Sequence, residues 1–229
     1  MKTEICKTDT ELVEIAVKAI QNQLNKKPDS VLALACGETM KPLWARMAEL
    51  KLPLRETRIL CVTELCGVKE SKTCRRALTE GLLDKTDADP ANCFFPDADA
   101  TEAYDRQIEN LGGIDLAILG IGEDCHIGYN EPGTLFEART HVQKLTDRTR
   151  RQLLKRGFTD ADMPETAVTV GIHDLTKARH ILLLATGEDK AAAVYQMLYA
   201  KTTPYIPAAY LQIPLEVTVL LDESAASKL

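Results

Sequence analysis

The residues best suited to proton transfer lie in one short segment that follows an apolar run. Asp124, His126 and Glu131 come directly after the apolar residues 116–121. A carboxylate beside an imidazole fixes the tautomer of the ring and raises its pKa, which is the arrangement of a tuned acid–base group. The same residues could instead satisfy turn amides and pack in a loop, and the spacing D-x-H-x4-E does not separate the two interpretations. With one histidine and no second cluster nearby, a metal site is not favoured.

Two further segments have the chemistry of an anion site. Gly37 follows an apolar run and allows a close turn before a helix predicted to begin near Thr39, whose first amides and positive dipole end favour an anion. The P-loop pattern is absent. Lys190 lies in the first turn of another predicted helix, where a cation is unfavourable unless a bound anion compensates it. A plain turn at Gly37 and a solvated lysine at position 190 are the structural alternatives.

The elements that must position these segments alternate in type along the chain. Short apolar runs predict buried strands at 31–35, 58–63, 115–121, 180–185 and 217–221. A capping box at Thr8–Glu11 begins a helix over about 9–25. Amphipathic stretches predict further helices at 40–50, 69–84, 101–111, 146–156 and 188–200.

This alternation predicts an α/β protein, a Rossmann-like three-layer sandwich with a mostly parallel sheet covered by helices on both faces. No repeat or linker interrupts the pattern, so we expect a single domain over residues 1–229. Ligands of such sheets gather beyond the carboxyl ends of the strands. The segments that directly follow the predicted strands are therefore the places where we expect the chemistry.

Composition excludes several classes of partner. The chain has 229 residues and a formal net charge of −6, which argues against nucleic acid as the main partner. The longest apolar runs are far below the ~20 residues of a membrane span, and the N-terminus has no secretory signal. Seven cysteines without a CxxC pair indicate reduced thiols and a cytoplasmic location. What remains is a soluble, single-domain protein that builds its own core.

The motifs also carry a family resemblance. Residues 120–132, GIGEDCHIGYNEP, are similar to the signature G-x-G-x-D-G-H-I-A-F-N-E-P, and residues 167–171 and 187–191 resemble A-L/I-T-V/M-G and G-x-x-K-A. From about residue 10 to 228 the chain resembles the glucosamine-6-phosphate isomerase/deaminase family, which shares its fold with the 6-phosphogluconolactonases. The Asn-Glu-Pro ending favours the deaminase branch. The family converts a 2-amino-2-deoxyhexose 6-phosphate into a ketohexose 6-phosphate and ammonia.

The resemblance implies roles for the ring-opening residues. His126 would open the pyranose ring by moving a proton between the ring oxygen and the anomeric hydroxyl, while Asp124 and Glu131 would orient the imidazole and balance its charge. No metal or organic cofactor is implied. The expected partner is a sugar phosphate, and the expected assembly is a monomer or a small homo-oligomer.

The resemblance also implies a site for the 6-phosphate. Lys190 and the loop Gly37–Thr39 would bind it, together with a basic residue of the helix after the signature. That helix ends in Leu-Lys-Arg-Gly-Phe at 154–158. We predict Arg156 as the phosphate ligand, with Lys155 as the alternative.

Two positions depart from the family pattern. Where the family has an aspartate that shuttles a proton between C2 and C1, this chain has Thr63, whose hydroxyl cannot act as a general base near neutral pH. In the phosphate loop, Glu38 adds a carboxylate beside the expected phosphate. One hypothesis joins both departures: Glu38 replaces the missing aspartate, and Thr63 contacts the substrate. We therefore expect an isomerase/deaminase of glucosamine or galactosamine 6-phosphate; a 6-phosphosugar lactonase and a non-catalytic sugar-phosphate-binding protein are the alternatives.

Overall fold

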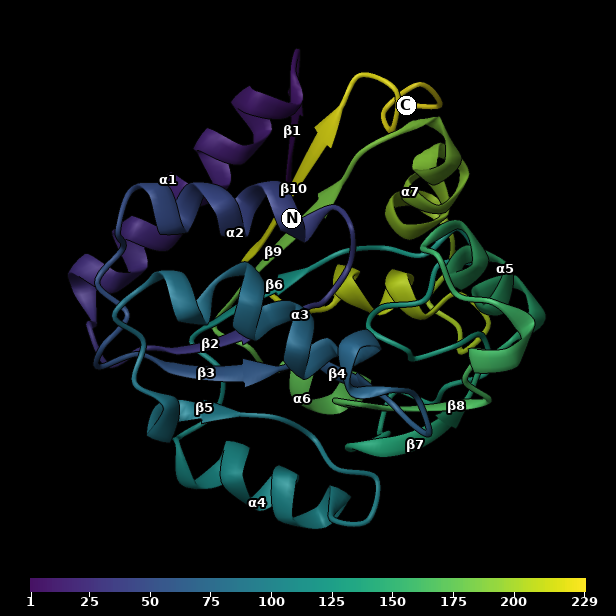
Figure 1. Cartoon of the computed structure of the whole chain (residues 1–229). Helices are drawn as coiled ribbons and strands as arrows, with labels where there is room; N and C mark the ends of the chain where they lie inside the picture. Colours follow the sequence, from purple (N-terminus) through teal and green to yellow (C-terminus); the bar gives the residue numbers. More distant parts are fainter.

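A central parallel sheet organises the molecule. The computed structural model describes all residues 1–229, and Figure 1 shows the sheet running through it. Its strand order is β1-β10-β9-β6-β2-β3-β5, and every neighbouring pair is parallel. The strands are β1 (Lys2–Cys6), β2 (Val31–Leu34), β3 (Arg58–Cys61), β5 (Cys93–Phe94), β6 (Leu116–Leu119), β9 (His180–Ala185) and β10 (Val217–Asp222).

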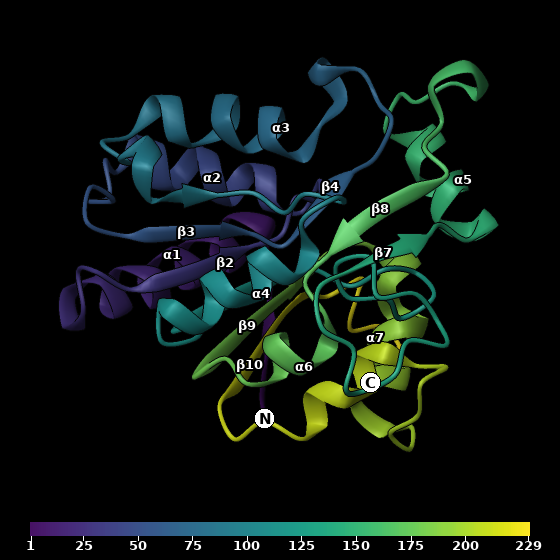
Figure 2. The same cartoon turned by 90° about the horizontal axis from the view of Figure 1, so that it is seen from below.

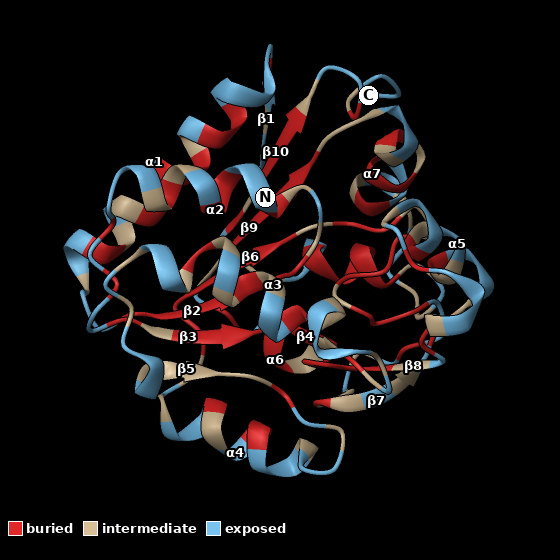
Figure 3. Ribbon diagram, viewed as in Figure 1, coloured by how far each residue is buried: buried red, intermediate tan, exposed pale blue.

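Helices cover both faces of this sheet, because its central strands are apolar on both sides. Along β2, Leu32 and Leu34 pack into the core under α1, α2 and α3, whereas Val31 and Ala33 pack into the core under α4, α6 and α7. Figure 2 shows these two layers, and Figure 3 shows the buried strands between them. The helices are α1 (Asp9–Lys26), α2 (Met40–Glu49), α3 (Cys74–Gly81), α4 (Thr101–Asn110), α5 (Asp147–Lys155), α6 (Ile172–Thr176) and α7 (Ala191–Tyr199).

The predicted α/β sandwich is confirmed, with three corrections. The N-terminal residues form β1, an edge strand. It was not predicted, because its exposed polar residues interrupt the apolar run by which the other strands were recognised. The prediction of one strand over 58–63 is wrong at its end, because β3 stops at Cys61 and the chain continues into a separate sheet. That antiparallel sheet, with the order β4-β8-β7, was not predicted. It consists of β4 (Thr63–Leu65), β8 (Thr166–Thr169) and β7 (His141–Lys144).

The strand order also places the expected site. From β2 the chain builds outward through β3 and β5, and it then returns through β6 to the other side of β2. A crevice opens beyond the carboxyl ends of the strands at such a reversal. The loops after β2, β6 and β9 therefore meet there, and these are the loops that carry Gly37, His126 and Lys190.

No helix is long and apolar enough to span a membrane.

Candidate active site

A cavity of ≈ 430 Å³ opens where these loops meet. It collects residues that are far apart in the sequence, and α5 contributes to its wall. The predicted site residues that line it are Gly37, Glu38, Thr39, Thr63, His126, Arg156 and Lys190. The two other predicted residues, Asp124 and Glu131, contact the imidazole of His126. The structure thus brings all of the predicted residues to one place.

The loop after β6 fixes the imidazole of His126. The Gly122 N–H donates to the His126 carbonyl at 2.9 Å, and Cys125 closes the turn with a φ of 69°, in the left-handed region that favours glycine. Nδ1 of His126 then lies 2.7 Å from Oδ1 of Asp124. Burial raises the pKa of Asp124, but the hydrogen bond and the attraction to His126 outweigh burial and hold it at about 2.

The charge of Asp124 determines which ring nitrogen carries the proton. Because an ionised carboxylate only accepts hydrogen bonds, Nδ1 of His126 is the donor in this pair. The intramolecular contacts of the ring are made by Nδ1, while His126 also lines the cavity. Nε2 is therefore the nitrogen available to exchange a proton with a bound molecule.

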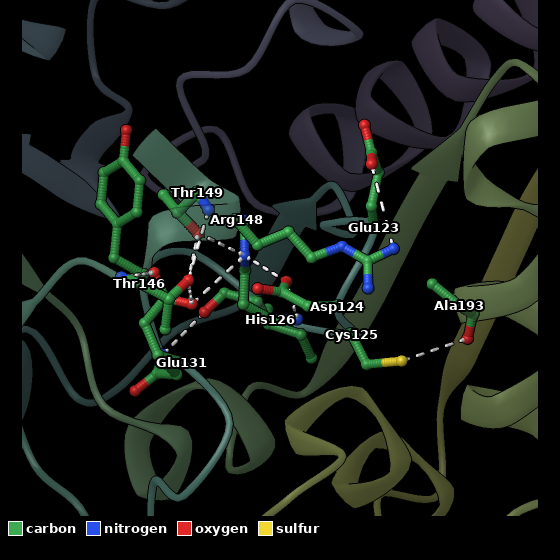
Figure 4. Close-up of polar contacts among 12 residues, drawn as sticks. Glu123, Asp124, Cys125, His126, Glu131, Thr146, Arg148, Thr149 and Ala193 are labelled. Carbon is green, nitrogen blue, oxygen red and sulfur yellow. Dashed lines mark hydrogen bonds and ion pairs between the residues drawn. The ribbon is translucent and has the colours of Figure 1, made fainter. Parts of the chain in front are cut away.

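Glu131 is the second carboxylate at the ring and the more deeply buried one. Its side chain is 1% exposed, and its Oε2 lies 3.7 Å from Nδ1 of His126. At the N-terminus of α5, the Thr146 amide and hydroxyl donate to the two carboxylate oxygens, each at 3.3 Å (Figure 4). Burial raises the pKa of Glu131, although the charge of His126 and hydrogen bonds from α5 oppose that rise. A positive imidazole would be stabilised by both carboxylates.

The same trio has the spacing of a metal site. One donor atom from each of Asp124, His126 and Glu131 lies within 4.8 Å of the others. A metal ion would need the lone pair of Nδ1, which carries a proton in the hydrogen bond to Asp124. This arrangement suits proton transfer at Nε2 better than metal ligation at Nδ1.

The cations are concentrated at another part of the cavity. Nη2 of Arg156 donates to the Cys36 carbonyl at 3.1 Å, and the arginine side chain is 25% exposed. Lys190 is also mostly buried, and its Nζ lies 3.5 Å from Asp189. Lys155, in contrast, is 70% exposed and pairs with Glu123 at 3.1 Å. The structure therefore places Arg156, rather than Lys155, against the loop that follows β2.

That loop has free donors of its own. The Met40 and Lys41 amides at the start of α2 already donate to the Gly37 and Glu38 carbonyls, whereas the amides of Gly37, Glu38 and Thr39 have no partner in the protein and are available to an anion. Across the cavity, Gly187 turns with a φ of 92°, and its N–H donates to Asp222 at 2.9 Å. This turn leads directly to Lys190. Two loops and the end of α5 thus converge with donors and cations on one volume.

Thr63 and Glu38 have different surroundings. Thr63 is buried, and its hydroxyl lies 3.6 Å from the Cys74 thiol. Its neighbour Glu64 accepts the amides of Cys74 and Arg75, which commits that carboxylate to the N-terminus of α3. Glu38 is half-exposed, pairs with Lys41 at 2.7 Å and lies 3.4 Å from Nε of Arg156. To act as a base, Glu38 would have to leave both cations.

The cysteines divide between the site and the core. Cys36 lines the cavity, and its sulfur lies 3.4 Å from that of Cys61. Hydrogen bonds with Cys61 and Cys74, together with burial, raise the pKa of Cys36 well above its usual value. Cys125 points instead toward the Ala193 carbonyl on α7. The pKa of Cys125 is raised to about 11, mainly by burial, so this thiol is protonated near neutral pH.

Two threonines at the site were missed from the sequence. Thr146 and Thr149 belong to the first turn of α5, and they contact Glu131 and His126 respectively. The available signal was the N-cap position: Thr146 precedes the helix and accepts the Thr149 amide at 3.2 Å. A capping threonine is common, however, and only the fold shows that this cap faces the Glu131 carboxylate.

Comparison with known proteins shows the family of the chain. Residues 7–219 match the family described as glucosamine-6-phosphate isomerases/6-phosphogluconolactonase, and the chain belongs to that family. It is 35% identical over 240 residues to glucosamine-6-phosphate deaminase 1 of Bacillus subtilis, in an alignment that covers 99% of each chain.

Two solved structures, a deaminase and a lactonase, resemble this chain to different degrees. One is a monomeric glucosamine-6-phosphate deaminase, which matches with a TM-score of 0.96 and 33% identity over the whole of both chains. The other is the 6-phosphogluconolactonase of Trypanosoma brucei, with a TM-score of 0.81, 22% identity and coverage of 100% of this chain and 98% of that one. The lactonase likeness is one of fold, whereas the likeness to the deaminases extends to the sequence.

Proposed function

We propose that the protein isomerises and deaminates a 2-amino-2-deoxyhexose 6-phosphate, releasing a ketohexose 6-phosphate and ammonia. The observation that carries this proposal is the imidazole of His126, whose Nδ1 is held by Asp124 and whose Nε2 is left to the cavity. The similarity of the whole chain to glucosamine-6-phosphate deaminases favours this reaction over lactone hydrolysis.

The first chemical step is ring opening. Nε2 of His126 takes the proton of the anomeric hydroxyl and returns a proton to the ring oxygen as the C1–O5 bond breaks. The imidazolium formed in between lies beside the carboxylates of Asp124 and Glu131, whose charges lower its energy. Arg156, Lys190 and the loop Gly37–Thr39 bind the 6-phosphate and hold the sugar in place for this transfer.

The second step moves a proton from C2 to C1 and needs a base. We assign this role to Glu38, a carboxylate that lines the cavity, because Thr63 stands where the family has its aspartate base. Its charge is engaged by Lys41 and Arg156 before substrate binds. The incoming phosphate supplies a replacement anion for Arg156, which would release Glu38 from that arginine, and the remaining pair with Lys41 is exposed and therefore weak. As the C2 proton moves to C1, a proton also passes from the amine nitrogen to O1, which gives a C1 hydroxyl and a C2 imine. Water then attacks this imine and yields the ketone and ammonia.

The deciding experiment offers three substrates to the purified protein. We expect ammonia and a ketose phosphate from glucosamine 6-phosphate, or from its C4 epimer galactosamine 6-phosphate, and none from a His126→Gln variant. Acid release from 6-phosphogluconolactone without ammonia from either amino sugar would establish the lactonase alternative. Binding of a phosphosugar without turnover of any of the three would leave a binding protein.

We also infer that the enzyme works as a monomer in the cytoplasm. The support is the monomeric deaminase that it resembles over its full length, together with seven cysteines that are all free. Light scattering during size-exclusion chromatography tests the first point, with a mass near 25.3 kDa expected. A mass of twice that value or more would contradict it.

A further inference from the structure

The first turn of α5 reaches the imidazole that opens the ring. The Thr149 side chain is buried, and its Oγ1 lies 3.3 Å from Nδ1 of His126. Figure 4 shows Thr149 beside Thr146, with both hydroxyls directed at the group formed by His126 and Glu131. Thr149 does not line the cavity, so it would not touch a bound sugar.

The protons in this group can be assigned from the charges. The Nδ1 proton of His126 is donated to Asp124, whose oxygen is closer than the Thr149 hydroxyl. The hydroxyl proton of Thr149 is then free to be donated to Glu131. A hydrogen bond from Thr149 lowers the pKa of Glu131, against the effect of burial, which is the larger one. The hydroxyl therefore supports the ionised form of the second carboxylate.

We propose that Thr149 is a positioning residue for ring opening: its hydroxyl, 3.3 Å from Nδ1 of His126, holds the Glu131 carboxylate beside the ring in the arrangement that stabilises the imidazolium. The inference rests on the proposed function. Because Thr149 acts through Glu131 and His126, its loss would change the rate of the chemical step and the pH at which that step fails. It would not change the affinity for the sugar phosphate.

The same helix connects this residue to the other end of the cavity. Arg156, which follows the last residue of α5, donates to the Cys36 carbonyl. Glu123 of the catalytic loop pairs with Lys155 at 3.1 Å and lies 3.9 Å from Arg148, so α5 is tied to that loop near both of its ends.

The test compares Thr149→Val, which keeps the shape of the side chain and removes the hydroxyl, with Thr149→Ser, which keeps the hydroxyl. Thr79→Val on α3, where the side chain makes no hydrogen bond, is the matched control. Because Thr149→Val removes a hydrogen bond to a charged group, it should lower kcat at least about tenfold while KM stays within about twofold. The acid limb of kcat should move to higher pH, because Glu131 without this donor is protonated more easily. Thr149→Ser and Thr79→Val should keep the wild-type rate and limb.

A second readout does not depend on turnover. The Nδ1 proton of His126, in its 2.7 Å hydrogen bond to Asp124, should give a downfield NMR resonance that His126→Gln removes. We expect this resonance to be broadened or lost in Thr149→Val and kept in Thr149→Ser. An unchanged resonance in Thr149→Val, or equal damage from the serine variant, would overturn the positioning role. If the wild type releases no ammonia but the resonance behaves as expected, the proposed function fails and the positioning role stands.

Discussion

Gly122 packs against the face of the His126 imidazole. Its N–H donates to the His126 carbonyl at 2.9 Å, and a Cβ placed on Gly122 would come within 2.3 Å of the ring. The imidazole is thus confined on three sides: by the backbone of Gly122, by the carboxylates of Asp124 and Glu131, and by α5. The fourth side is the cavity.

This contact predicts that Gly122→Ala inactivates the protein without unfolding it. The added methyl group must push the ring away from the hydrogen bond to Asp124, and general acid–base catalysis is worth about 10²–10⁴ in rate. We expect kcat to fall at least about a hundredfold. Gly120→Ala is the control, because its Cβ would meet only ordinary contacts at 3.6 Å and beyond. Equal activity of both variants in the ammonia assay would show that the ring tolerates displacement.

The neighbouring cations Arg156 and Lys155 should differ in their effect on substrate affinity. Arg156→Gln removes a buried charge that contacts the phosphate loop, and we expect KM for the amino sugar phosphate to rise about tenfold or more. Lys155→Gln removes an exposed ion pair with Glu123, which is worth at most about 1 kcal/mol. Steady-state kinetics of the two variants shows which residue binds the phosphate. A larger rise in KM for Lys155→Gln than for Arg156→Gln would make Lys155 the ligand.

The assignment of Glu38 as the C1/C2 base makes a prediction of two parts. Glu38→Gln should lower kcat about a hundredfold or more, because an amide cannot accept the C2 proton. The same change removes a carboxylate from Arg156, so KM should stay the same or fall. Glu49→Gln, which removes an exposed partner of Arg46, is the matched control. A normal kcat in Glu38→Gln would mean that another group moves the proton.

Much of the fold could be predicted because the central strands are apolar on both faces. Runs such as Leu116–Leu119 and His180–Ala185 stand out between amphipathic segments, and the structure places both in the sheet. β1 did not stand out, because an edge strand with one open face keeps charged residues. The small antiparallel sheet was missed for a different reason: its pairing of Thr63 with Thr169 joins segments about a hundred residues apart, which no local pattern can encode.

The site could be predicted as far as residue type and strand end determine it. His126, Lys190 and Gly37 all follow buried strands, and parallel strands bring such loops together. The partners of these residues could not be predicted, because they depend on where α5 lies. The sequence predicted Arg156 but left Lys155 as the alternative, and the direction of the last helical turn separates the two. Thr146 and Thr149 were missed for the same reason.

The two carboxylates at His126 should affect stability with opposite signs. Burial raises the pKa of Glu131, so its ionised form is less favourable in the folded protein, and its charge costs stability at every pH above that raised pKa. The pKa of Asp124 is instead held at about 2, below its usual 3.8 despite burial, by its hydrogen bond and attraction to His126. Its charge contributes stability above pH 4 that is lost as the pH falls toward 2.

Melting temperatures between pH 2 and 8 test both signs. Glu131→Gln should melt at a higher temperature than the wild type at pH 7, and the difference should shrink as the pH falls through the raised pKa, because the wild-type carboxyl then becomes neutral as well. Asp124→Asn should melt at a lower temperature than the wild type at pH 7, because its free energy of unfolding is lower by on the order of 1–2 kcal/mol. This difference should disappear as the pH approaches 2. Both variants should lose activity, because each removes a charge that stabilises the imidazolium. A lower melting temperature for Glu131→Gln at pH 7 would mean that the hydrogen bonds from Thr146 and Thr149 outweigh the cost of burying the charge. If Glu131→Gln is more stable than the wild type but less active, then the buried charge of Glu131 costs stability and serves catalysis.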